Sequence, residues 1–457
     1  MSQALVTDLY ELNMAASYLR RGMTGLATFS LFVRDLPRGR GFLVAGGLED
    51  CLAYLETFAF AEEDLRWLSA AGFAGDSIGA FASLRFTGDV HAIPEGRVVL
   101  PNEPLLEVTA PIAQAQLVET YLLNQVTFQT AIATKAARCR LAAGGDIDLV
   151  DFALRRTHGV DAGMAVARLS AIAGFTATSN VEAARRFGLQ AAGTMAHSYI
   201  EAFADEASAF RAFATDLPGR TTFLVDTYDT LAGVEAAIGV IRELGLTRSL
   251  AVRLDSGDLA ALARETRRLL DAAGLPQVRI FVSGGLDELD LERMRLEGVP
   301  VDAAGVGTRL GVSADAPSLD SAYKLVAYDG RPVLKLSEGK ATLPGPKQVW
   351  RRMPVTEDLL ARRDEPGSAG YEPLLLPVMR AGQRTGPPDT VAAARARLER
   401  DLAGLPAHAR DLREPVPPQV RVSGSLRDLA ATLTDDLRHR GKTERSMPGG
   451  TGSGRLT

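Results

Sequence analysis

The spacing of apolar and polar positions changes near Gly145, and this change divides the chain. Before it, helices are predicted at 7–20, 48–55, 63–70 and 113–143, and strands at 27–33, 97–100 and 105–108. Apolar residues recurring every three or four positions predict the helices, and short apolar runs between Pro and Gly turns predict the strands. Residues 1–145 are therefore predicted to form an N-terminal α+β domain of sandwich-like architecture.

From residue 146 onward, short apolar runs alternate with helical segments. The seven predicted strands are 147–152, 171–177, 189–192, 222–225, 250–254, 278–282 and 301–306. The helices between them are predicted at 163–169, 181–187, 231–244, 259–273 and 286–297. This alternation predicts a parallel sheet, which an open doubly wound sheet and a closed (β/α) barrel would both satisfy.

Polar residues follow every predicted strand of this region and favour the barrel. They are Arg155 and Arg156, Ser179 and Asn180, residues 194–198, Asp226, residues 255–258, residues 283–285, and Gly307 with Thr308. A doubly wound sheet concentrates such residues at one crevice, whereas a barrel carries them around its rim. Helix capping alone is the alternative, since Ser, Thr, Asp and Asn are usual there. We predict an α/β fold with an irregular barrel of about seven parallel strands over 146–317.

The remaining chain is predicted to contain strands first and helices afterwards. Asp-Gly and Pro-Gly turns separate strand-like runs over 318–352, which we expect to complete the N-terminal domain. Residues 353–441 are charged and predict a C-terminal helical extension. Residues 442–457 predict a disordered tail, because they contain almost no apolar side chains.

Composition narrows the class of protein. Hydrophobic residues make up 46% and charged residues 23%, which is typical of a globular enzyme. A net charge of -5 argues against a nucleic-acid partner. Cys51 and Cys139 are far apart and predict a reducing compartment rather than disulfides. No signal peptide or apolar run of membrane-spanning length is recognisable, so we expect a cytoplasmic enzyme without a membrane partner.

Two glycine-containing turns close the last two predicted strands. One is Ser283-Gly284-Gly285 and the other is Gly307-Thr308. Glycines at such turns allow backbone N–H groups to approach an anion, and barrels often bind phosphate after their final two strands. The alternative is that these are ordinary turn glycines.

The segment VRLDSGD places Arg253, Asp255 and Asp258 at another strand end. The two aspartates could bind Mg²⁺ or a ribose diol, and Arg253 could bind a carboxylate or pyrophosphate in bidentate fashion. A turn with a helix cap and a salt bridge is the structural alternative.

Two further strand ends carry candidate chemistry. Arg155 and Arg156 directly follow an apolar strand, where either an anionic ligand or acidic neighbours would balance their charge. His197 lies between Thr194 and Ser198 and suits a general base, a metal ligand or a phosphoryl acceptor. The alternative is a structural role, which is more common for a lone histidine.

Several motifs together resemble the nicotinate phosphoribosyltransferase family. They are TDLYELNMA, DFALRRTHG, SNVEAARRFGLQAAGTMAHSYI, LVDTYDT, VRLDSGD, and GVGT followed by YKLVAY, in that order. The resemblance covers most of residues 6–350. It implies a type II phosphoribosyltransferase with an irregular α/β barrel, working as a homodimer or higher homo-oligomer with a shared active site.

The resemblance also implies a role for each matching residue. His197 would be the histidine that ATP phosphorylates. Nicotinate would contact Tyr10, Arg155, Thr194 and Arg253, with Tyr10 donated by a neighbouring subunit. Phosphoribosyl pyrophosphate would contact Arg156, Asp255, Ser283, Gly284, Gly285, Gly307 and Thr308. Mg²⁺ would be held by Asp255 and Asp258.

The implied reaction forms nicotinate mononucleotide and pyrophosphate from nicotinate and phosphoribosyl pyrophosphate, with coupled ATP hydrolysis, in NAD biosynthesis. Asp151 leaves nicotinamide open as the substrate, because nicotinamide-using relatives carry aspartate in a similar strand. The adjacent Arg155 and Arg156 favour the anionic pyridine, since a neutral amide would leave their charge unmet. The chain could also be a non-catalytic nucleotide-sensing barrel. A quinolinate phosphoribosyltransferase fits poorly, because those enzymes are usually much shorter and lack an ATP-phosphorylated histidine.

Overall fold

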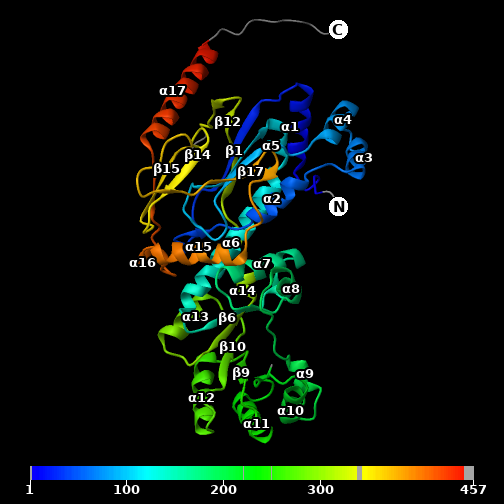
Figure 1. Cartoon of the computed structure of the whole chain (residues 1–457), viewed down its shortest axis with the longest axis vertical. Coiled ribbons are helices and arrows are strands. Elements are labelled where there is room, and N and C mark those ends of the chain that lie inside the picture. The colour runs from blue at the N-terminus through cyan, green and yellow to red at the C-terminus, as the bar shows by residue number, and fades with distance from the viewer. Residues whose placement is uncertain (1–2, 220, 249, 337–341, 447–457) are drawn as a thin grey trace.

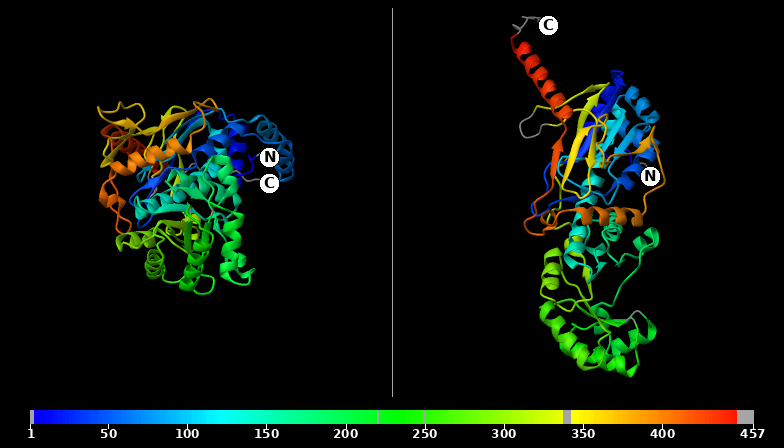
Figure 2. Two further views of the ribbon diagram at one scale, coloured as in Figure 1. Left: turned by 60° about the horizontal axis from the view of Figure 1, so that its bottom comes forward. Right: turned by 60° about the vertical axis from the view of Figure 1, so that its left-hand side comes forward.

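An antiparallel sheet system and a parallel sheet lie at opposite ends of the long axis of the molecule (Figure 1). The computed structural model describes residues 3–219, 221–248, 250–336 and 342–446, with side chains described as far as residue 439. Figure 2 shows the same two-part arrangement from two other sides.

The larger antiparallel sheet has seven strands. Their order is β13 (Arg331–Pro332), β12 (Ser321–Tyr328), β1 (Leu26–Val33), β5 (Pro104–Pro111), β3 (Asp89–Ala92), β17 (Leu376–Arg380) and β18 (Gln383–Arg384). Strand β1 has all but its first residue buried and lies between β12 and β5. Neighbouring strands therefore come from distant parts of the chain.

Helices and one short ladder accompany this sheet. The helices are α1 (Leu9–Arg20), α2 (Leu48–Thr57), α3 (Glu62–Ala70), α4 (Gly75–Ser83) and α5 (Ile112–Leu117). Strands β2 (Leu43–Val44) and β4 (Val98–Val99) pair antiparallel. The helix predicted over 113–143 is interrupted at Val118, so that α5 is followed by the separate helix α6 (Glu119–Ala143).

The C-terminal region forms a second sheet of four strands. The order is β16 (Glu372–Pro373), β14 (Lys347–Arg351), β15 (Glu357–Arg362) and β19 (Gln419–Val422), and only the last pair is parallel. The helices of this region are α15 (Val391–Gly404), α16 (Ala407–Arg410) and α17 (Gly424–Ser446). The prediction of a purely helical extension over 353–441 is therefore wrong.

Buried charge explains this error. Arg351 donates to the Asp358 and Asp401 carboxylates, and all three residues have 0% exposure. Charged residues that pair inside a sheet look like surface positions in the sequence, because buried charges are otherwise rare. The predicted tail over 442–457 begins inside α17, and residues 447–457 lie outside the described part of the chain.

The parallel sheet has six strands instead of the predicted seven. The order is β7 (Ala177–Thr178), β6 (Asp148–Asp151), β11 (Ala303–Val306), β10 (Arg279–Val282), β9 (Leu250–Leu254) and β8 (Thr221–Leu224). Edge strands β7 and β8 do not pair with each other within the described residues, so the sheet is a curled half-barrel. The strand predicted at 171–177 begins at the end of α7 (Val160–Ile172), and residues 189–192 contribute only a bridge between Thr178 and Ala191.

Within the described residues, seven further helices follow the strands of the half-barrel. They are α8 (Val181–Phe187), α9 (His197–Glu201), α10 (Glu206–Asp216), α11 (Thr230–Glu243), α12 (Leu259–Ala272), α13 (Glu288–Leu296) and α14 (Thr308–Gly311). Asn180, Asp229, Asp258 and Asp287 each cap the following helix with a side-chain oxygen. Several of the polar strand-end residues are thus helix caps, as the capping interpretation predicted.

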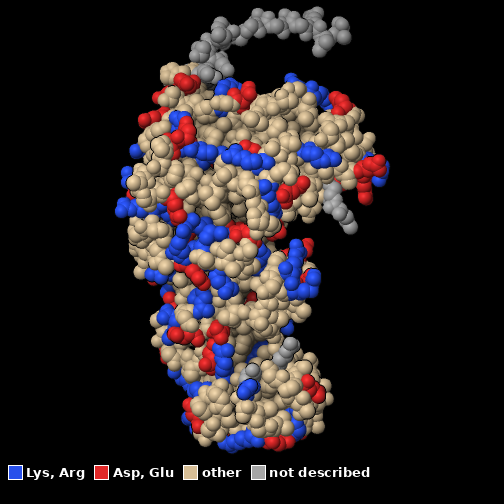
Figure 3. Space-filling model, viewed as in Figure 1, with Lys and Arg blue, Asp and Glu red and all other residues tan. Residues whose placement is uncertain are grey.

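Three further features of the described residues concern the surface charge, the apolar character of the helices and the cysteines. Lys and Arg side chains are mixed with Asp and Glu over the face shown in Figure 3. Within the described residues, no helix combines the length and apolar character that a bilayer crossing requires. Cys51 and Cys139 are buried free thiols.

Candidate active site

Arg253, near the end of β9, is the centre of a polar cluster at the carboxyl edge of the half-barrel. Its Nε donates to Ser283 Oγ at 2.8 Å, and Nη1 donates to Thr194 Oγ1 at 2.9 Å. Nη2 donates to Asp255 Oδ1 at 2.5 Å. Only 7% of Arg253 is exposed, so the guanidinium is held in one orientation by three strand ends.

Asp255 connects this guanidinium to the rest of the cluster. Its Oδ1 also accepts from Ser283 Oγ at 2.5 Å. Burial alone would raise the pKa of Asp255, but the hydrogen bond from Ser283 and the charge of Arg253 lower it below its usual range. The carboxylate is therefore ionised at neutral pH.

His197 opens α9 and faces this carboxylate. Its Nε2 lies 3.8 Å from Asp255 Oδ2, and its Nδ1 lies 3.2 Å from Thr227 Oγ1. The side chain is 40% exposed. The imidazole is thus oriented by two neighbours and still open to a ligand. The sequence placed His197, Thr194, Arg253, Asp255 and Ser283 in one site, and the structure brings these five together.

Asp226 and Thr227, which follow β8, belong to the same cluster, although neither was predicted as a site residue. Asp226 Oδ2 accepts from the Asp255 N–H at 3.1 Å and from Ser256 Oγ at 2.5 Å. Its Oδ1 is buried and has no hydrogen-bond partner among the described residues. The position of LVDTYDT at a strand end was the available signal.

Asp258 has a different role from Asp255, because it caps a helix. Its Oδ1 accepts from the Ala261 N–H at 3.1 Å and caps α12. No group of three or more His, Cys, Asp or Glu residues in the described ranges is arranged to hold a metal ion. An ion here would have to rely on few protein ligands.

The two glycine turns lie side by side, because β10 and β11 are neighbouring strands. Gly284 and Gly285 have φ values of +106° and +74°, a region that favours glycine. A Cβ on Gly284 would lie 2.1 Å from the Asp255 carbonyl oxygen. Gly307 caps α14, whose first residue is Thr308. The loop after β10 thus packs directly on the loop after β9.

Replacing Gly284 by alanine is expected to displace the loop after β10. The positive φ alone costs about 1–3 kcal/mol for a side chain, and the collision with Asp255 adds to it. We expect activity to fall at least about tenfold, following the rule that 1.4 kcal/mol is a factor of ten. Initial rates and thermal unfolding would be measured beside Gly298→Ala, whose Cβ meets nothing within 4 Å although its φ is also positive, at +59°. Equal losses in both variants would assign the effect to φ alone.

Arg155 and Arg156 lie on a short 3₁₀ turn (Leu154–Arg156) after β6. Both are exposed, and neither side chain makes a hydrogen bond or ion pair with a described residue. The alternative that acidic neighbours balance their charge is therefore wrong within the described residues, and both guanidinium groups are available to an anionic ligand. Asp151, beneath them, is buried and accepts from the Ala153 N–H at 2.8 Å and from Thr178 Oγ1 at 2.7 Å. Burial raises the pKa of its carboxyl.

Tyr10 is not brought to this cluster within one chain. It lies on α1, at the opposite end of the molecule from β9 and α9 (Figure 1). The residue is 48% exposed. Burial and the nearby Glu119 raise the pKa of its hydroxyl, which therefore stays protonated.

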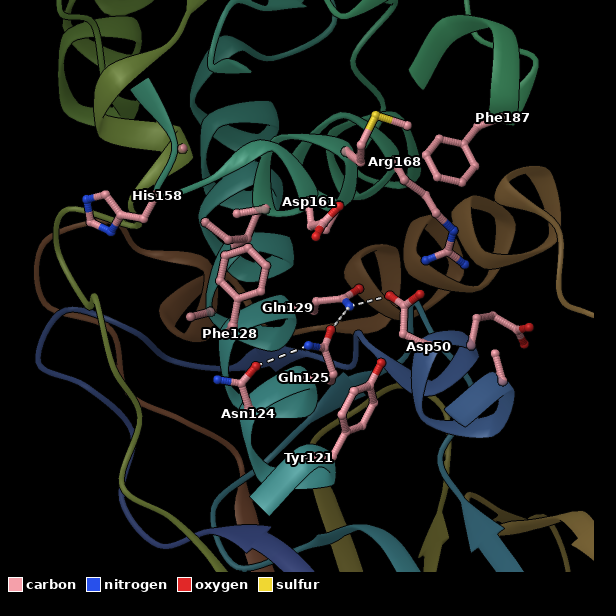
Figure 4. A pocket seen from close by; sticks show the side chains of 18 of the residues that line it. Asp50, Tyr121, Asn124, Gln125, Phe128, Gln129, His158, Asp161, Arg168 and Phe187 are labelled. Atoms are coloured by element: carbon pink, nitrogen blue, oxygen red, sulfur yellow. Dashed lines mark hydrogen bonds between the residues drawn. The ribbon is translucent and has the colours of Figure 1, made fainter. Parts of the chain in front are cut away.

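A separate cavity of about 970 Å³ lies between α2 and α6 on one side and α7 and α8 on the other (Figure 4). A hydrogen-bonded row of Asn124, Gln125, Gln129 and Asp50 forms part of its wall. No residue predicted for the site lines this cavity. None of the predicted chemistry therefore involves this cavity.

Comparison with known families gives two matches along the chain. The nicotinate phosphoribosyltransferase N-terminal domain matches residues 5–127, and the nicotinate phosphoribosyltransferase family matches residues 147–338. A nicotinate phosphoribosyltransferase of Mycobacterium tuberculosis is 47% identical over 436 residues, covering 93% of each chain. The human nicotinate phosphoribosyltransferase is 33% identical over 522 residues, covering 94% of this chain and 97% of its own.

Solved structures give a consistent result. The crystal structure of human nicotinic acid phosphoribosyltransferase has a TM-score of 0.83 at 32% identity and covers 93% of this chain and 99% of its own. The nicotinate-nucleotide pyrophosphorylase of Pyrococcus furiosus has a TM-score of 0.73 at 26% identity, covering 88% and 95%. The half-barrel with its antiparallel N-terminal sheet is thus the fold of these proteins.

Proposed function

The chain belongs to the nicotinate phosphoribosyltransferase family, and from that premise we propose how its strand-end cluster works. The protein is an enzyme of NAD salvage that forms nicotinate mononucleotide from nicotinate and phosphoribosyl pyrophosphate. The buried guanidinium of Arg253, held by Thr194, Asp255 and Ser283, is the observation that carries the assignment of the active site.

Nicotinate binding is assigned to the side of the cluster that carries Arg253 and Thr194. The Arg253 guanidinium lies 5.6 Å from the centre of the Phe152 ring, which itself stacks on Phe281 at 5.6 Å. A cation beside an aromatic face suits an anionic pyridine ring. Exposed Arg155 supplies a second positive group from the neighbouring rim.

Phosphoribosyl pyrophosphate is assigned to the two glycine loops and Arg156. Backbone N–H groups after β10 and β11, with the Thr308 hydroxyl, would hold the 5-phosphate. The Arg156 guanidinium has no partner among the described residues and can pair with the pyrophosphate, which leaves as charge develops on the ribose. Asp255 would accept from the ribose hydroxyl groups.

Magnesium fits this site only as an ion shared with the substrate. Mg²⁺ commonly uses one or two carboxylates together with substrate phosphates. Asp255 and Asp226 offer such a pair, because Asp226 Oδ1 is buried without a partner among the described residues. We favour Asp226 over Asp258 as the second ligand, since Asp258 caps α12. The ion would neutralise charge on the pyrophosphate.

His197 is proposed to accept the γ-phosphoryl group of ATP. The Thr227 hydroxyl can accept a hydrogen bond from the Nδ1–H, which leaves the Nε2 lone pair available as the nucleophile. A bond from Nε2 to the γ-phosphorus forms while the bond to the β–γ bridging oxygen breaks, and ADP leaves. Hydrolysis of the phosphohistidine would then restore the free imidazole and couple ATP to product formation.

A second subunit is proposed to complete the site. Tyr10 lies far from the cluster in one chain, and the half-barrel is open between β7 and β8. Both features support a homodimer or higher homo-oligomer in which a neighbour contributes Tyr10. The two free thiols fit a reducing compartment and support a cytoplasmic location.

The direct test is product formation from phosphoribosyl pyrophosphate, Mg²⁺ and ATP, comparing nicotinate with nicotinamide by chromatography. We expect nicotinate mononucleotide from nicotinate and little product from nicotinamide, because guanidinium groups bind a carboxylate more strongly than a neutral amide. Turnover with nicotinamide alone would overturn the assignment of Arg253 and Arg155 to a carboxylate. No turnover with either compound would favour a non-catalytic barrel.

A further inference from the structure

Two side chains that have no proposed contact with substrate join the two glycine loops. Asp287 lies two residues after Gly285, in the loop that follows β10. Arg309 directly follows Thr308, behind β11. Arg309 Nη1 donates to Asp287 Oδ2 in a close ion pair. This pair is a side-chain bridge between the two halves of the proposed phosphate site.

Asp287 is fixed on both of its oxygens. While Oδ2 accepts from Arg309, Oδ1 accepts from the N–H groups of Leu289 at 2.9 Å and Asp290 at 3.2 Å and so caps α13. Asp287 is 8% exposed. Burial would raise the pKa of its carboxyl, but the hydrogen bond from Arg309 and the backbone lower it below the usual range. The carboxylate is therefore charged, and it cannot turn away from Arg309 without losing the cap.

A buried lysine links the same two segments from below. Lys135 on α6 forms a close ion pair with Glu288, the first residue of α13. Its Nζ also lies 3.0 Å from Asp315 Oδ1, in the segment that follows α14. Lys135 and Glu288 side chains are each 2% exposed. Lys135 thus connects the beginning of α13 to the segment after α14. The Asp287–Arg309 pair connects the same part of the chain at a second point.

We propose that Asp287 and Arg309 are positioning residues that set the separation of the two loops holding the 5-phosphate of phosphoribosyl pyrophosphate. The proposal rests on the assignment of that phosphate to the glycine loops. Donors on two separate loops bind one phosphate well only at one separation, and a displacement of about 1 Å can cost on the order of 100-fold. The bridge holds the loops at that separation before substrate arrives.

The test compares Arg309→Ala, Asp287→Asn and the double variant. Asparagine retains the oxygen that caps α13 and removes the charge that holds Arg309. We expect each single variant to raise KM for phosphoribosyl pyrophosphate about tenfold, below the 100-fold cost of a full 1 Å displacement. The double variant should raise it no further, because both changes break one link. KM for nicotinate should stay within about twofold, and Arg309→Lys should restore most of the affinity, because a single donor makes the contact.

Arg293→Ala is the matched control. Arg293 lies on α13 and pairs with Asp290 at 3.5 Å, but its side chain is 57% exposed and the pair joins no loops. We expect its KM values and melting temperature to match those of the unaltered enzyme. Inhibition by ribose 5-phosphate provides a second readout, whose inhibition constant should rise in parallel with KM in the Asp287 and Arg309 variants.

The outcomes separate the proposal from its premise. A raised KM in Arg309→Ala with an unchanged KM in Asp287→Asn would overturn the positioning role, since Arg309 would then contact the phosphate itself. Unchanged KM in both variants, with a raised KM in Thr308→Ala, would overturn the bridge and leave the phosphate site intact. Unchanged KM in all three variants would overturn the assignment of the phosphate to these loops, and the proposal with it.

Discussion

His197→Ala is expected to lose stimulation by ATP and to retain slow, ATP-independent transfer. The imidazole lies beside Asp255 and Thr227, where it can accept a phosphoryl group, while Arg253 and the glycine loops do not depend on it. We expect the ATP-stimulated rate to fall on the order of 100-fold, the low end of the range for a positioned catalytic side chain. The measurements are initial rates with and without ATP, and labelling of the protein by γ-labelled ATP.

His158→Ala is the matched control for this prediction. His158 is exposed, lines the separate cavity instead of the Arg253 cluster, and its side chain makes no hydrogen bond with a described residue. Its replacement should leave both the label and the ATP stimulation unchanged. Full ATP stimulation in His197→Ala would show that the phosphoryl acceptor lies elsewhere.

Arg253→Ala is expected to have the largest effect on use of nicotinate. The guanidinium holds three strand ends together, and its removal also leaves the buried Ser283 and the partly buried Asp255 side chains short of a donor. Loss of a buried charged partner costs about 3–5 kcal/mol. If that loss falls on the transition state, kcat/KM for nicotinate should drop by roughly 10²–10⁴-fold. Steady-state kinetics over a range of nicotinate concentrations would measure it.

Two further variants separate charge from geometry. Arg253→Lys retains the positive charge without the planar fork, so we expect it to recover less than about a tenth of the lost kcat/KM. Arg279→Ala, on the neighbouring strand, removes an exposed arginine that pairs with Asp148 at 2.7 Å. Normal kinetics in Arg279→Ala are expected. Full recovery in Arg253→Lys would contradict a bidentate role for Arg253.

Several residues of the site could be predicted from the sequence, because they stand in recognisable motifs at the ends of predicted strands. Arg253 and Asp255 stand close together in a motif, and parallel strands bring the following Ser283 to the same edge. Asp226 was harder, because an aspartate before a helix is usually a cap. Its buried oxygen, which has no partner among the described residues, distinguishes it from the true cap Asp258.

Errors in the predicted fold arose where the burial of a segment differs from what its local sequence pattern indicates. The apolar run at 171–177 looked like a strand, but its first residues pack as the end of α7, and short apolar runs do not distinguish the two. Strand β15 was missed because its buried Asp358 pairs with Arg351, which no spacing rule reveals. Helix α8 was predicted with its observed bounds, since Asn180 caps it and Gly188 ends it in a left-handed conformation.

The interleaving of strands in the seven-stranded sheet has a consequence for synthesis on the ribosome. Strand β1 is made early, but its neighbour β12 begins at Ser321, about 210 residues after β5 ends at Pro111. At roughly 5–20 residues per second, one edge of β1 remains unpaired for roughly 10–40 s while the ribosome synthesises the half-barrel. An unpaired apolar strand recruits other chains during such a delay. Nascent chains of this enzyme therefore depend on protection of β1 until the last third of translation, and slow codons between the two strands would lower the yield of folded protein.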